Sequence, residues 1–187
     1  KTFSNILISG DGGDEIFAGY TFRYKKFLSL TNDDSTSLEK IKAYLSCHER
    51  DRVSDQELLF GKKSHFSWNL IYDSLLPYFD NSLSRLQQVF LADYNGKLLY
   101  NFNPINTRIV KNFDIEVITP LLNQNLISYG LKINTPFKYN ESKNIGKLPL
   151  RELLVKYEAD SLISKEKLGF NVNTINLWNL HGHKLCK

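Results

Sequence analysis

Chemically useful side chains gather near the beginning of the chain, between an apolar run and the start of a helical pattern. The apolar run covers residues 3–8, and Ser9-Gly10-Asp11-Gly12-Gly13-Asp14-Glu15 follows it directly. Glycines permit a turn with positive φ and a close approach of the backbone to a ligand. Ligands also collect at the carboxyl ends of parallel strands, where the next helix offers free N–H groups to phosphate. This stretch therefore predicts a buried strand that leads into a phosphate site.

Two carboxylates complicate this prediction. Asp14 and Glu15 would repel a phosphate unless a divalent cation lay between them, and Mg²⁺ binds through one or two carboxylates plus phosphate oxygens. Alternatively, acids in a first helical turn complement the helix macrodipole, and the glycines only form the turn. The spacing leaves both interpretations open. If the loop binds a ligand, a Cβ atom at Gly12 or Gly13 should block binding with little general unfolding.

A second candidate is Lys147, which lies between a polar stretch and a helical pattern. Residues 134–146 have loop character, and connections of that length are often functional. Pro149 suits the first turn of the helix that follows. Lys147 by itself is most simply a solvated lysine. The alternative is a cation that closes over a ligand when the loop becomes ordered.

Three segments in order along the chain resemble one known family. Residues 9–20, Ser-Gly-Asp-Gly-Gly-Asp-Glu-Ile-Phe-Ala-Gly-Tyr, are similar to the second signature of the synthetase domain of asparagine synthetases. Lys147-x-x-Leu150-Arg151 and Lys167-x-Gly169-Phe170 resemble two later motifs of that family. The resemblance covers roughly residues 3–178.

Between these segments, residues 116–123 are similar to the family's Glu-x-Arg-x-Pro-Phe-Leu-Asp motif. The chain keeps the glutamate, the proline and the second leucine. Ile118 replaces the arginine and Asn123 replaces the aspartate, so the substrate side differs from the family pattern. Upstream, Arg108 matches the arginine of an Asp-Arg pair, with Thr107 in place of the acid. Glu116 is either a substrate-side residue or a surface acid at a helix end.

The resemblance implies an α/β fold of the adenine-nucleotide-hydrolase-like type, which is a Rossmann-like ATP-pyrophosphatase fold. Residues 1–187 would be the C-terminal portion of its synthetase domain, with the first strand and ligand loop at 3–15 and a mainly helical part at 16–187. The family's Ser-Gly-Gly-x-Asp-Ser pyrophosphate loop and its glutaminase domain are not found in this sequence. We therefore expect this chain alone to be incomplete and inactive.

The resemblance also implies a reaction, in which ATP adenylates aspartate and ammonia from glutamine displaces AMP to give asparagine. ATP and Mg²⁺ are the expected cofactors. Catalytic roles fall to Lys147, as the cation beside the leaving pyrophosphate, and to Asp11, as the group that handles the proton of ammonia. The expected cofactor-binding residues are Ser9, Gly10, Gly12, Gly13 and Asp14, with Asp14 also on Mg²⁺ through pyrophosphate, and the expected substrate residues are Glu116, Arg108 and Arg151.

Two rival functions stay open. The first is another adenylating amide-forming enzyme on the same scaffold, such as a β-lactam or lasso-peptide cyclase, because Ile118 and Asn123 depart from the family pattern. The second is a non-catalytic remnant or regulatory partner that keeps the fold. The expected partners of a synthetase are a glutaminase domain and the N-terminal part of the synthetase domain.

Composition excludes several other classes. The 187 residues carry a formal charge of +4 that is spread along the sequence, so we expect no nucleic-acid partner. No apolar stretch approaches the roughly 20 residues that cross a bilayer, so we expect no membrane partner and a cytoplasmic location. Cys47-His48 is a poor nucleophile–base pair, because neighbours on a helix diverge by about 100°. His181-x-His183-x-x-Cys186 lacks the fourth ligand that structural zinc normally needs.

Hydrophobic periodicity predicts the elements that position these residues. We expect one helix from residue 16 to about 30, a second that starts near Leu38, and a long helix at 83–98 that ends before Asn103-Pro104. Two more helices are expected in 105–134 around a break at Thr119-Pro120, with Gly130 as the cap of the second. Shorter helices are expected at 55–60 and 67–76, and the last helix begins near Lys147.

Overall fold

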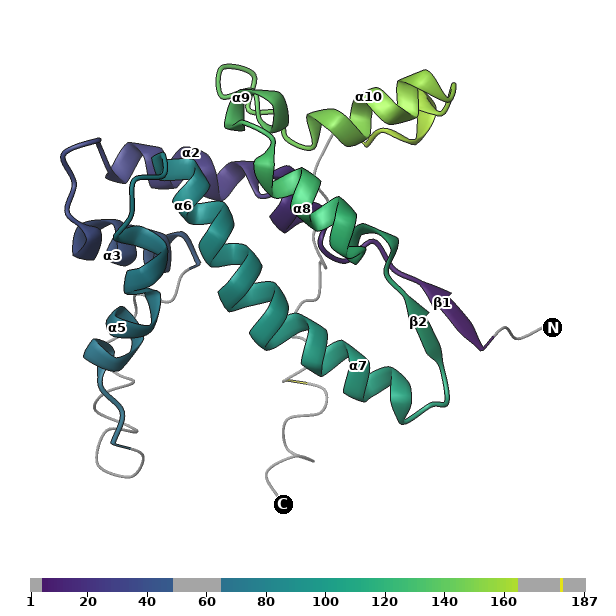
Figure 1. Ribbon diagram of the computed structural model, residues 1–187, viewed down its shortest axis with the longest axis horizontal. Helices are drawn as coiled ribbons and strands as arrows, with labels where there is room; N and C mark the ends of the chain where they lie inside the picture. Colours follow the sequence, from purple (N-terminus) through teal and green to yellow (C-terminus); the bar gives the residue numbers. More distant parts are fainter. Residues whose placement is uncertain (1–4, 49–64, 165–178, 180–187) are drawn as a thin grey trace. The chain divides into compact units, whose positions relative to one another are not determined.

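The computed structural model describes residues 5–48, 65–164 and Asn179, and it divides the chain into two compact units, residues 1–152 and 153–187. The first unit is mostly helical with one small parallel sheet (Figure 1). Both features are compatible with an α/β fold. Its shorter elements are α1 (Gly13–Phe17), η2 (Pro120–Leu122) and α9 (Thr135–Lys138), and its longer ones, with α10 crossing into the second unit, are α2 (Thr21–Leu30), α3 (Ser37–Cys47), α5 (Trp68–Phe79), α6 (Arg85–Ala92), η1 (Asp93–Phe102), α7 (Asn103–Lys111), α8 (Gln124–Lys132) and α10 (Leu148–Lys156).

The sheet consists of β1 (Ile6–Ile8) and β2 (Glu116–Ile118), which pair in parallel with Leu7 opposite Val117. The expectation of a buried strand is wrong for β1, because Ile8 is 71% exposed and Leu7 is 49% exposed. Within the described residues the sheet has two strands, so little covers its faces. β2 was also not expected, since the sequence pattern favoured a helix there.

The expected single helix from residue 16 to 30 is wrong. It is divided between α1 and α2, because Ala18 adopts a left-handed conformation with φ 62°. The backbone N–H of Gly19 donates to the carbonyl of Asp14 at 2.8 Å and closes the end of α1. This break between the two helices lies directly beside the candidate site.

The core lies among α2, α3, α5 and α6. Tyr24 is fully buried, and its ring makes edge contacts with Phe90 at 5.2 Å and Tyr139 at 5.4 Å between centroids. α3 begins as expected, since the side chain of Thr36 accepts from the backbone N–H of Glu39 and the Glu39 side chain accepts in return. The helix expected at 67–76 is α5, which runs further, and the helix expected at 55–60 lies outside the described residues.

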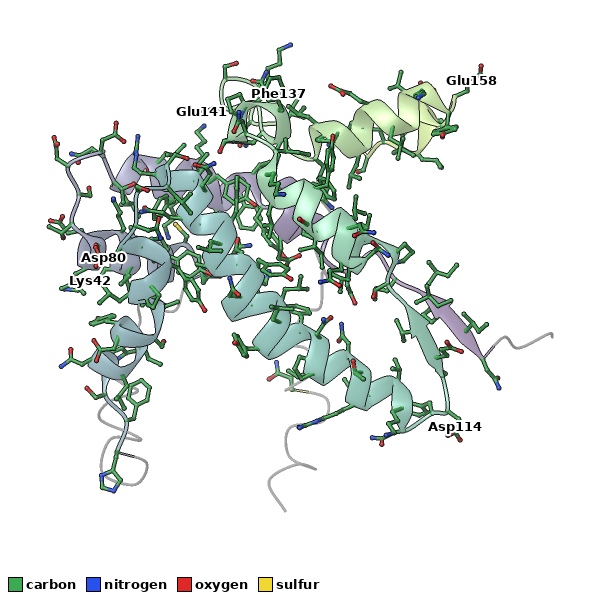
Figure 2. All side chains as sticks on the ribbon, in the orientation of Figure 1. Lys42, Asp80, Asp114, Phe137, Glu141 and Glu158 are labelled. Atoms are coloured by element: carbon green, nitrogen blue, oxygen red, sulfur yellow. The ribbon has the colours of Figure 1, made fainter. Side chains whose placement is uncertain are left out.

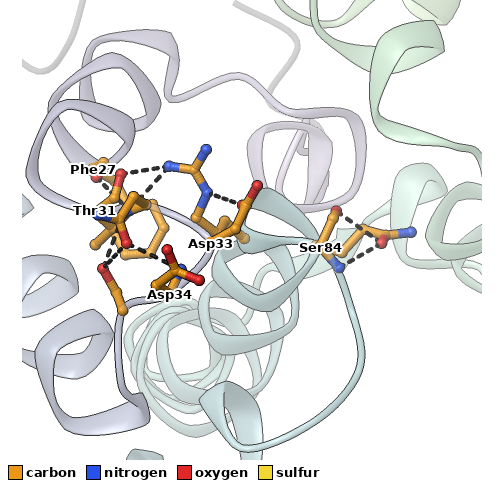
Figure 3. Close-up of polar contacts among 9 residues, drawn as sticks. Phe27, Thr31, Asp33, Asp34 and Ser84 are labelled. Carbon is orange, nitrogen blue, oxygen red and sulfur yellow. Dashed lines mark hydrogen bonds and ion pairs between the residues drawn. The ribbon is translucent and has the colours of Figure 1, made fainter.

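Arg85, the first residue of α6, ties three segments of this core together (Figure 3). Its Nε donates to Asp33 Oδ1 at 2.9 Å and its Nη1 donates to the carbonyl of Thr31 at 2.5 Å. The hydroxyl of Thr31 donates in turn to the carbonyl of Phe27 at 2.9 Å. These contacts fix the end of α2 and the turn after it against α6.

A continuous helical run extends over α6, η1 and α7 (Figure 1). The expectation that it ends before Asn103-Pro104 is wrong. η1 is a π-helix, and Pro104 falls in the first turn of α7. Proline removes one backbone hydrogen bond from a helical run, and here it lies where the π-helical η1 passes into the α-helical α7. α7 ends at Lys111, and Asp114 follows it (Figure 2).

The polar stretch before Lys147 has more structure than expected. Residues 135–138 form α9, and Asn140 pairs with Ile145 in an antiparallel bridge. Gly130 is not the cap of α8 as expected, because it lies inside that helix, buried, and a Cβ there would meet the side chains of Ile16 and Phe17. Close packing against α1 therefore explains this glycine. Pro149 does lie in the first turn of α10, as expected.

In the second unit the end of α10 is followed by the short helix η3 (Asp160–Leu162). The backbone N–H of Ala159 donates to the carbonyl of Leu154 at 2.8 Å and closes the end of α10. Among the described residues, no helix has the length and apolar character needed to cross a bilayer.

Candidate functional site

The loop between β1 and α1 is compact and partly built from its own backbone. Gly12 has φ 87°, which is a left-handed conformation that favours glycine. The N–H of Gly13 donates to the carbonyl of Gly10 at 3.3 Å, and the N–H of Ile16 donates to that of Gly12 at 2.9 Å. The N–H of Ser9 donates to Ile118 at 2.9 Å and continues the pairing with β2. Strand, turn and helix thus follow in the order that the sequence predicts.

Each of the three acids in this stretch faces a nitrogen donor from a later segment. Asn106 Nδ2, from α7, donates to Asp11 Oδ2 at 3.2 Å. Lys147 Nζ, at the start of α10, lies 2.7 Å from Asp14 Oδ1. Lys97 Nζ, from η1, lies 3.7 Å from Glu15 Oε1. The loop is therefore held by residues that are far from it in sequence, and the structure brings the predicted pair Asp14 and Lys147 into contact.

Lys147 is anchored through its backbone as well as its side chain. It adopts a left-handed conformation, with φ 57°, and its N–H donates to the carbonyl of Phe17 at 2.9 Å. Its side chain is 38% exposed. The ammonium lies 3.8 Å from the position that a Cβ of Gly13 would take, so it is also close to the glycine loop. The Lys147 ammonium thus lies against Asp14 and beside the glycine loop.

Behind the loop, Tyr20 is held between two cations. Arg23 Cζ and Lys97 Nζ each lie over its ring at 3.6 Å from the centroid, and two such groups would overlap unless they occupied opposite faces. The Tyr20 hydroxyl donates to Glu15 Oε1 at 2.5 Å. Burial and then Arg23 lower the pKa of Lys97 to about 8. Burial and then Glu15 raise the pKa of Tyr20 well above its usual range.

The same network continues into the core through Asp93, which is fully buried. Asp93 Oδ1 accepts from Arg23 Nη1 at 3.1 Å and from the Tyr44 hydroxyl at 2.9 Å, and His48 Nε2 lies 3.4 Å away. Burial alone would raise the pKa of Asp93, but His48 and Arg23 outweigh burial and hold it below the usual value. Cys47, the residue before His48, is buried as well.

The glycines of the loop differ in what surrounds them. Around Gly10, a Cβ would meet no heavy atom within 4 Å, so the backbone there faces open space. At Gly12 a Cβ would overlap Leu122, and at Gly13 it would lie 3.0 Å from Leu121. The expectation that both Gly12 and Gly13 tolerate a larger residue without unfolding is therefore wrong for Gly12.

The predicted substrate residues come from three later elements, and the N–H of Arg151 donates to the carbonyl of Lys147 at 3.0 Å. Glu116 is exposed on β2, so it is a surface acid, but it lies on a strand and not at a helix end. Arg108 is exposed in the last turn of α7. Arg151 is half-buried, and its Nε donates to the carbonyl of Gly146 at 2.9 Å, so it supports the segment that carries Lys147.

Comparison with known families shows the family to which the chain belongs. The family model for asparagine synthase matches residues 1–187. The chain belongs to the asparagine synthase family. No curated protein and no solved structure was found to match the chain. Membership of the asparagine synthase family indicates an ATP-dependent amide-forming ligase, and it confirms the family that the motifs resemble.

The described residues of this asparagine synthase family chain provide few ligands for a metal ion. They contain no group of three or more His, Cys, Asp or Glu side chains that could hold a metal ion. Asp14 alone could contribute a carboxylate, and Mg²⁺ commonly uses one or two carboxylates together with substrate phosphates. The donor set therefore fits a Mg²⁺ ion that arrives with a phosphate ligand.

Sequence reasoning missed two of the three donors in this asparagine synthase family site. Asn106 and Lys97 carry no motif signal, and only the path of η1 and α7 past the loop brings them to it. A weak signal did exist for Asn106, because it directly precedes the Thr107-Arg108 pair. Lys167, Gly169 and Phe170, together with the rejected cluster of His181, His183 and Cys186, lie outside the described residues.

Proposed function

We propose that this chain is the part of an asparagine synthetase that binds the nucleotide and supplies the cation for adenylation of aspartate. The observation that carries the proposal is the contact of Lys147 with Asp14 at the glycine loop, in a chain that belongs to this family. ATP with Mg²⁺ supplies the activating group, and ammonia derived from glutamine displaces AMP. The protein acts in the cytoplasm.

Lys147 stabilises the charge that grows on the bridging oxygen as pyrophosphate leaves. A fixed cation that faces developing charge stabilises the transition state by several kcal/mol. Removal of one such group typically slows the chemical step by about 10²–10³. Asp14 would hold Mg²⁺, which would supply positive charge for the phosphate groups of ATP, and Ser9, Gly10, Gly12 and Gly13 would contact the nucleotide through the loop. Open space at Gly10 supports a close approach there.

Asp11 takes up the proton of the incoming ammonia, and Asn106 orients its carboxylate. Glu116, Arg108 and Arg151 contribute to the substrate side. The glutaminase domain and the pyrophosphate loop come from polypeptide outside these 187 residues, as does the N-terminal part of the sheet. The exposed side chains of β1 and β2 support this last point, because further strands would pair with the edges of the sheet and the helices that connect them would cover its faces.

The deciding experiment measures aspartate-dependent release of pyrophosphate from ATP by the natural polypeptide that contains these residues. Aspartate-dependent release, lost in an Asp14→Asn variant and retained in a Glu141→Gln variant at an exposed site, would support the proposal. Release with a different carboxylate substrate would favour a cyclase-like enzyme, which Ile118 in place of arginine keeps open. Absence of release with any carboxylate would favour a non-catalytic partner.

A further inference from the structure

Two glycines that no ligand contact explains lie at the junction between the α1–α2 break and the segment before α10. These are Gly19, which follows the left-handed Ala18, and Gly146, which precedes the left-handed Lys147. Neither glycine has a positive φ, so a turn conformation does not require either of them. Their need for glycine must come from the space around them.

At Gly19 that space is filled by the ion pair itself. A Cβ there would overlap Asp14 Oδ1, and it would lie 2.7 Å from Asp14 Cγ and 2.5 Å from Lys147 Cε. Both neighbours are side-chain atoms of the two residues that meet at the site. The missing Cβ of Gly19 therefore leaves the volume in which the Asp14–Lys147 pair lies.

At Gly146 the neighbour is backbone. A Cβ there would overlap the carbonyl oxygen of Ala18 and lie 3.0 Å from Ala18 C and from Thr21 Cγ2. The backbone of residue 146 is thus in direct contact with the break between α1 and α2. This approach brings the N–H of Lys147 within 2.9 Å of the carbonyl of Phe17, and Arg151 secures the carbonyl of Gly146 from the other side of the segment.

We infer that Gly19 and Gly146 are positioning residues that set the Lys147 ammonium against Asp14. Gly146 fixes the backbone from which Lys147 projects, and Gly19 leaves the room into which its side chain reaches. The left-handed conformation of Lys147 is maintained because its backbone is fixed through Gly146 and its side chain is fixed by the ion pair with Asp14. A role of this junction in adenylation rests on the proposed function. The geometry of the junction is independent of that proposal.

A double-mutant cycle on the stability of this chain tests the inference. Gly19→Ala should lower the folded-to-unfolded ratio by about tenfold, because its Cβ would overlap Asp14 Oδ1 and residues in direct contact are coupled in stability. In an Asp14→Ala, Lys147→Ala background the same change should cost about threefold or less, because the overlapping atoms are gone. The cost of Gly146→Ala should persist in that background, since the backbone of Ala18 remains. Gly96→Ala is the matched control, because a Cβ there meets nothing within 4 Å.

A second measurement follows the ammonium directly. The ¹⁵Nζ signal of Lys147, assigned by its loss in Lys147→Met, should be observable in the wild type and in Gly96→Ala, because an ion-paired ammonium exchanges its protons slowly. It should disappear in Gly19→Ala. Equal costs of Gly19→Ala in both backgrounds, or a retained signal in Gly19→Ala, would overturn the inference.

Folding failure of the single variant is also informative. If Gly19→Ala does not fold but regains the fold when Asp14 and Lys147 are alanine, the inference is supported, and if neither folds, it is overturned. The proposed function is judged separately by titration with Mg²⁺ and ATP. If the double-mutant cycle gives the expected costs but the protein binds no nucleotide, the proposed function is refuted and the inference about Gly19 and Gly146 is supported.

Discussion

At the scale of single residues, Lys147 is the side chain on which the proposed chemistry depends most. In the polypeptide assayed for pyrophosphate release, Lys147→Ala should slow acyl-adenylate formation by about 10²–10³, while ATP binding weakens much less. Lys147→Arg should restore little of the rate of acyl-adenylate formation, because a planar guanidinium does not replace a compact ammonium. Pulse-quench measurement of acyl-adenylate gives the rates, with the exposed Lys143→Ala as control. A normal burst in Lys147→Ala would make Lys147 a structural lysine.

Gly10 and Gly12 should separate ligand binding from folding. Gly10→Ala should leave the free energy of unfolding within about 0.5 kcal/mol, because its Cβ meets no other atom, yet it should weaken nucleotide binding. Gly12→Ala should cost about 1–3 kcal/mol, since it combines a left-handed backbone with overlap on Leu122. Urea unfolding and titration with ATP and Mg²⁺ measure the two effects. Unchanged nucleotide affinity in Gly10→Ala would argue against the proposed contact of the loop with the nucleotide.

Lys138 should make stability depend on pH. It is 1% exposed, its Nζ donates to the carbonyl of Ile16 at 3.2 Å, and burial lowers its pKa from 10.5 to about 8. Between pH 8 and 10.5 the unfolded chain therefore binds more protons than the folded chain, so stability should rise with pH in that window. Urea unfolding at pH 7.5, 8.5 and 9.5 checks the slope.

The matched variant for this pH series is Lys138→Met, which keeps the length of the side chain and removes the charge. It should flatten the rise without abolishing it, because the pKa of Lys97 is lowered in the same direction. Measurements stay below pH 10, since Tyr20 has a raised pKa and acts with the opposite sign above it. A slope identical to that of the wild type would mean that Lys138 is charged and well solvated.

At the scale of the elements, α3 owes its start to a reciprocal pair of contacts. Thr36 Oγ1 accepts from the N–H of Glu39 at 3.3 Å, and Glu39 Oε2 accepts from the N–H of Thr36 at 2.7 Å. Thr36→Ala should lower the free energy of unfolding by about 1 kcal/mol, the usual effect of losing such a cap. Thr36→Ser should restore most of it, because the hydroxyl is kept. Chemical unfolding followed by circular dichroism compares the three proteins, and equal midpoints would show that the cap does not matter.

The breaks between elements matter more for the site than the elements themselves. Ala18 ends α1 early, and η1 widens the helical run just where Lys97 and Phe102 face the region behind the loop. π-Helical segments often occur at functional sites, because the wider turn redirects side chains. Neither break follows from the spacing of apolar residues, which continues through both. The site therefore depends on irregular backbone that periodicity does not report.

At the scale of the whole chain, the sheet offers two uncovered strands. Ile8 is 71% exposed and Ile118 is 43% exposed, and apolar patches of this kind commonly mark contact surfaces. Leu7→Lys combined with Ile8→Lys should reduce self-association of the chain, measured by light scattering over a concentration series. Phe137→Lys, at another exposed aromatic residue, serves as control. Equal association in both variants would mean that the sheet does not mediate it.

The sequence by itself determined the family and the strand–loop–helix order at residues 6–17. Local rules carry that information, because glycines, caps and motif spacing act within a few residues. Only the tertiary structure decided that Lys147 meets Asp14 directly, that Asn106 and Lys97 hold the other two acids, and that β2 pairs with β1. These contacts join residues about 80 to 130 positions apart. The Lys147–Asp14 contact also depends on space left by Gly19 and Gly146 and on the left-handed conformations at Ala18 and Lys147, which no periodic pattern in the sequence encodes.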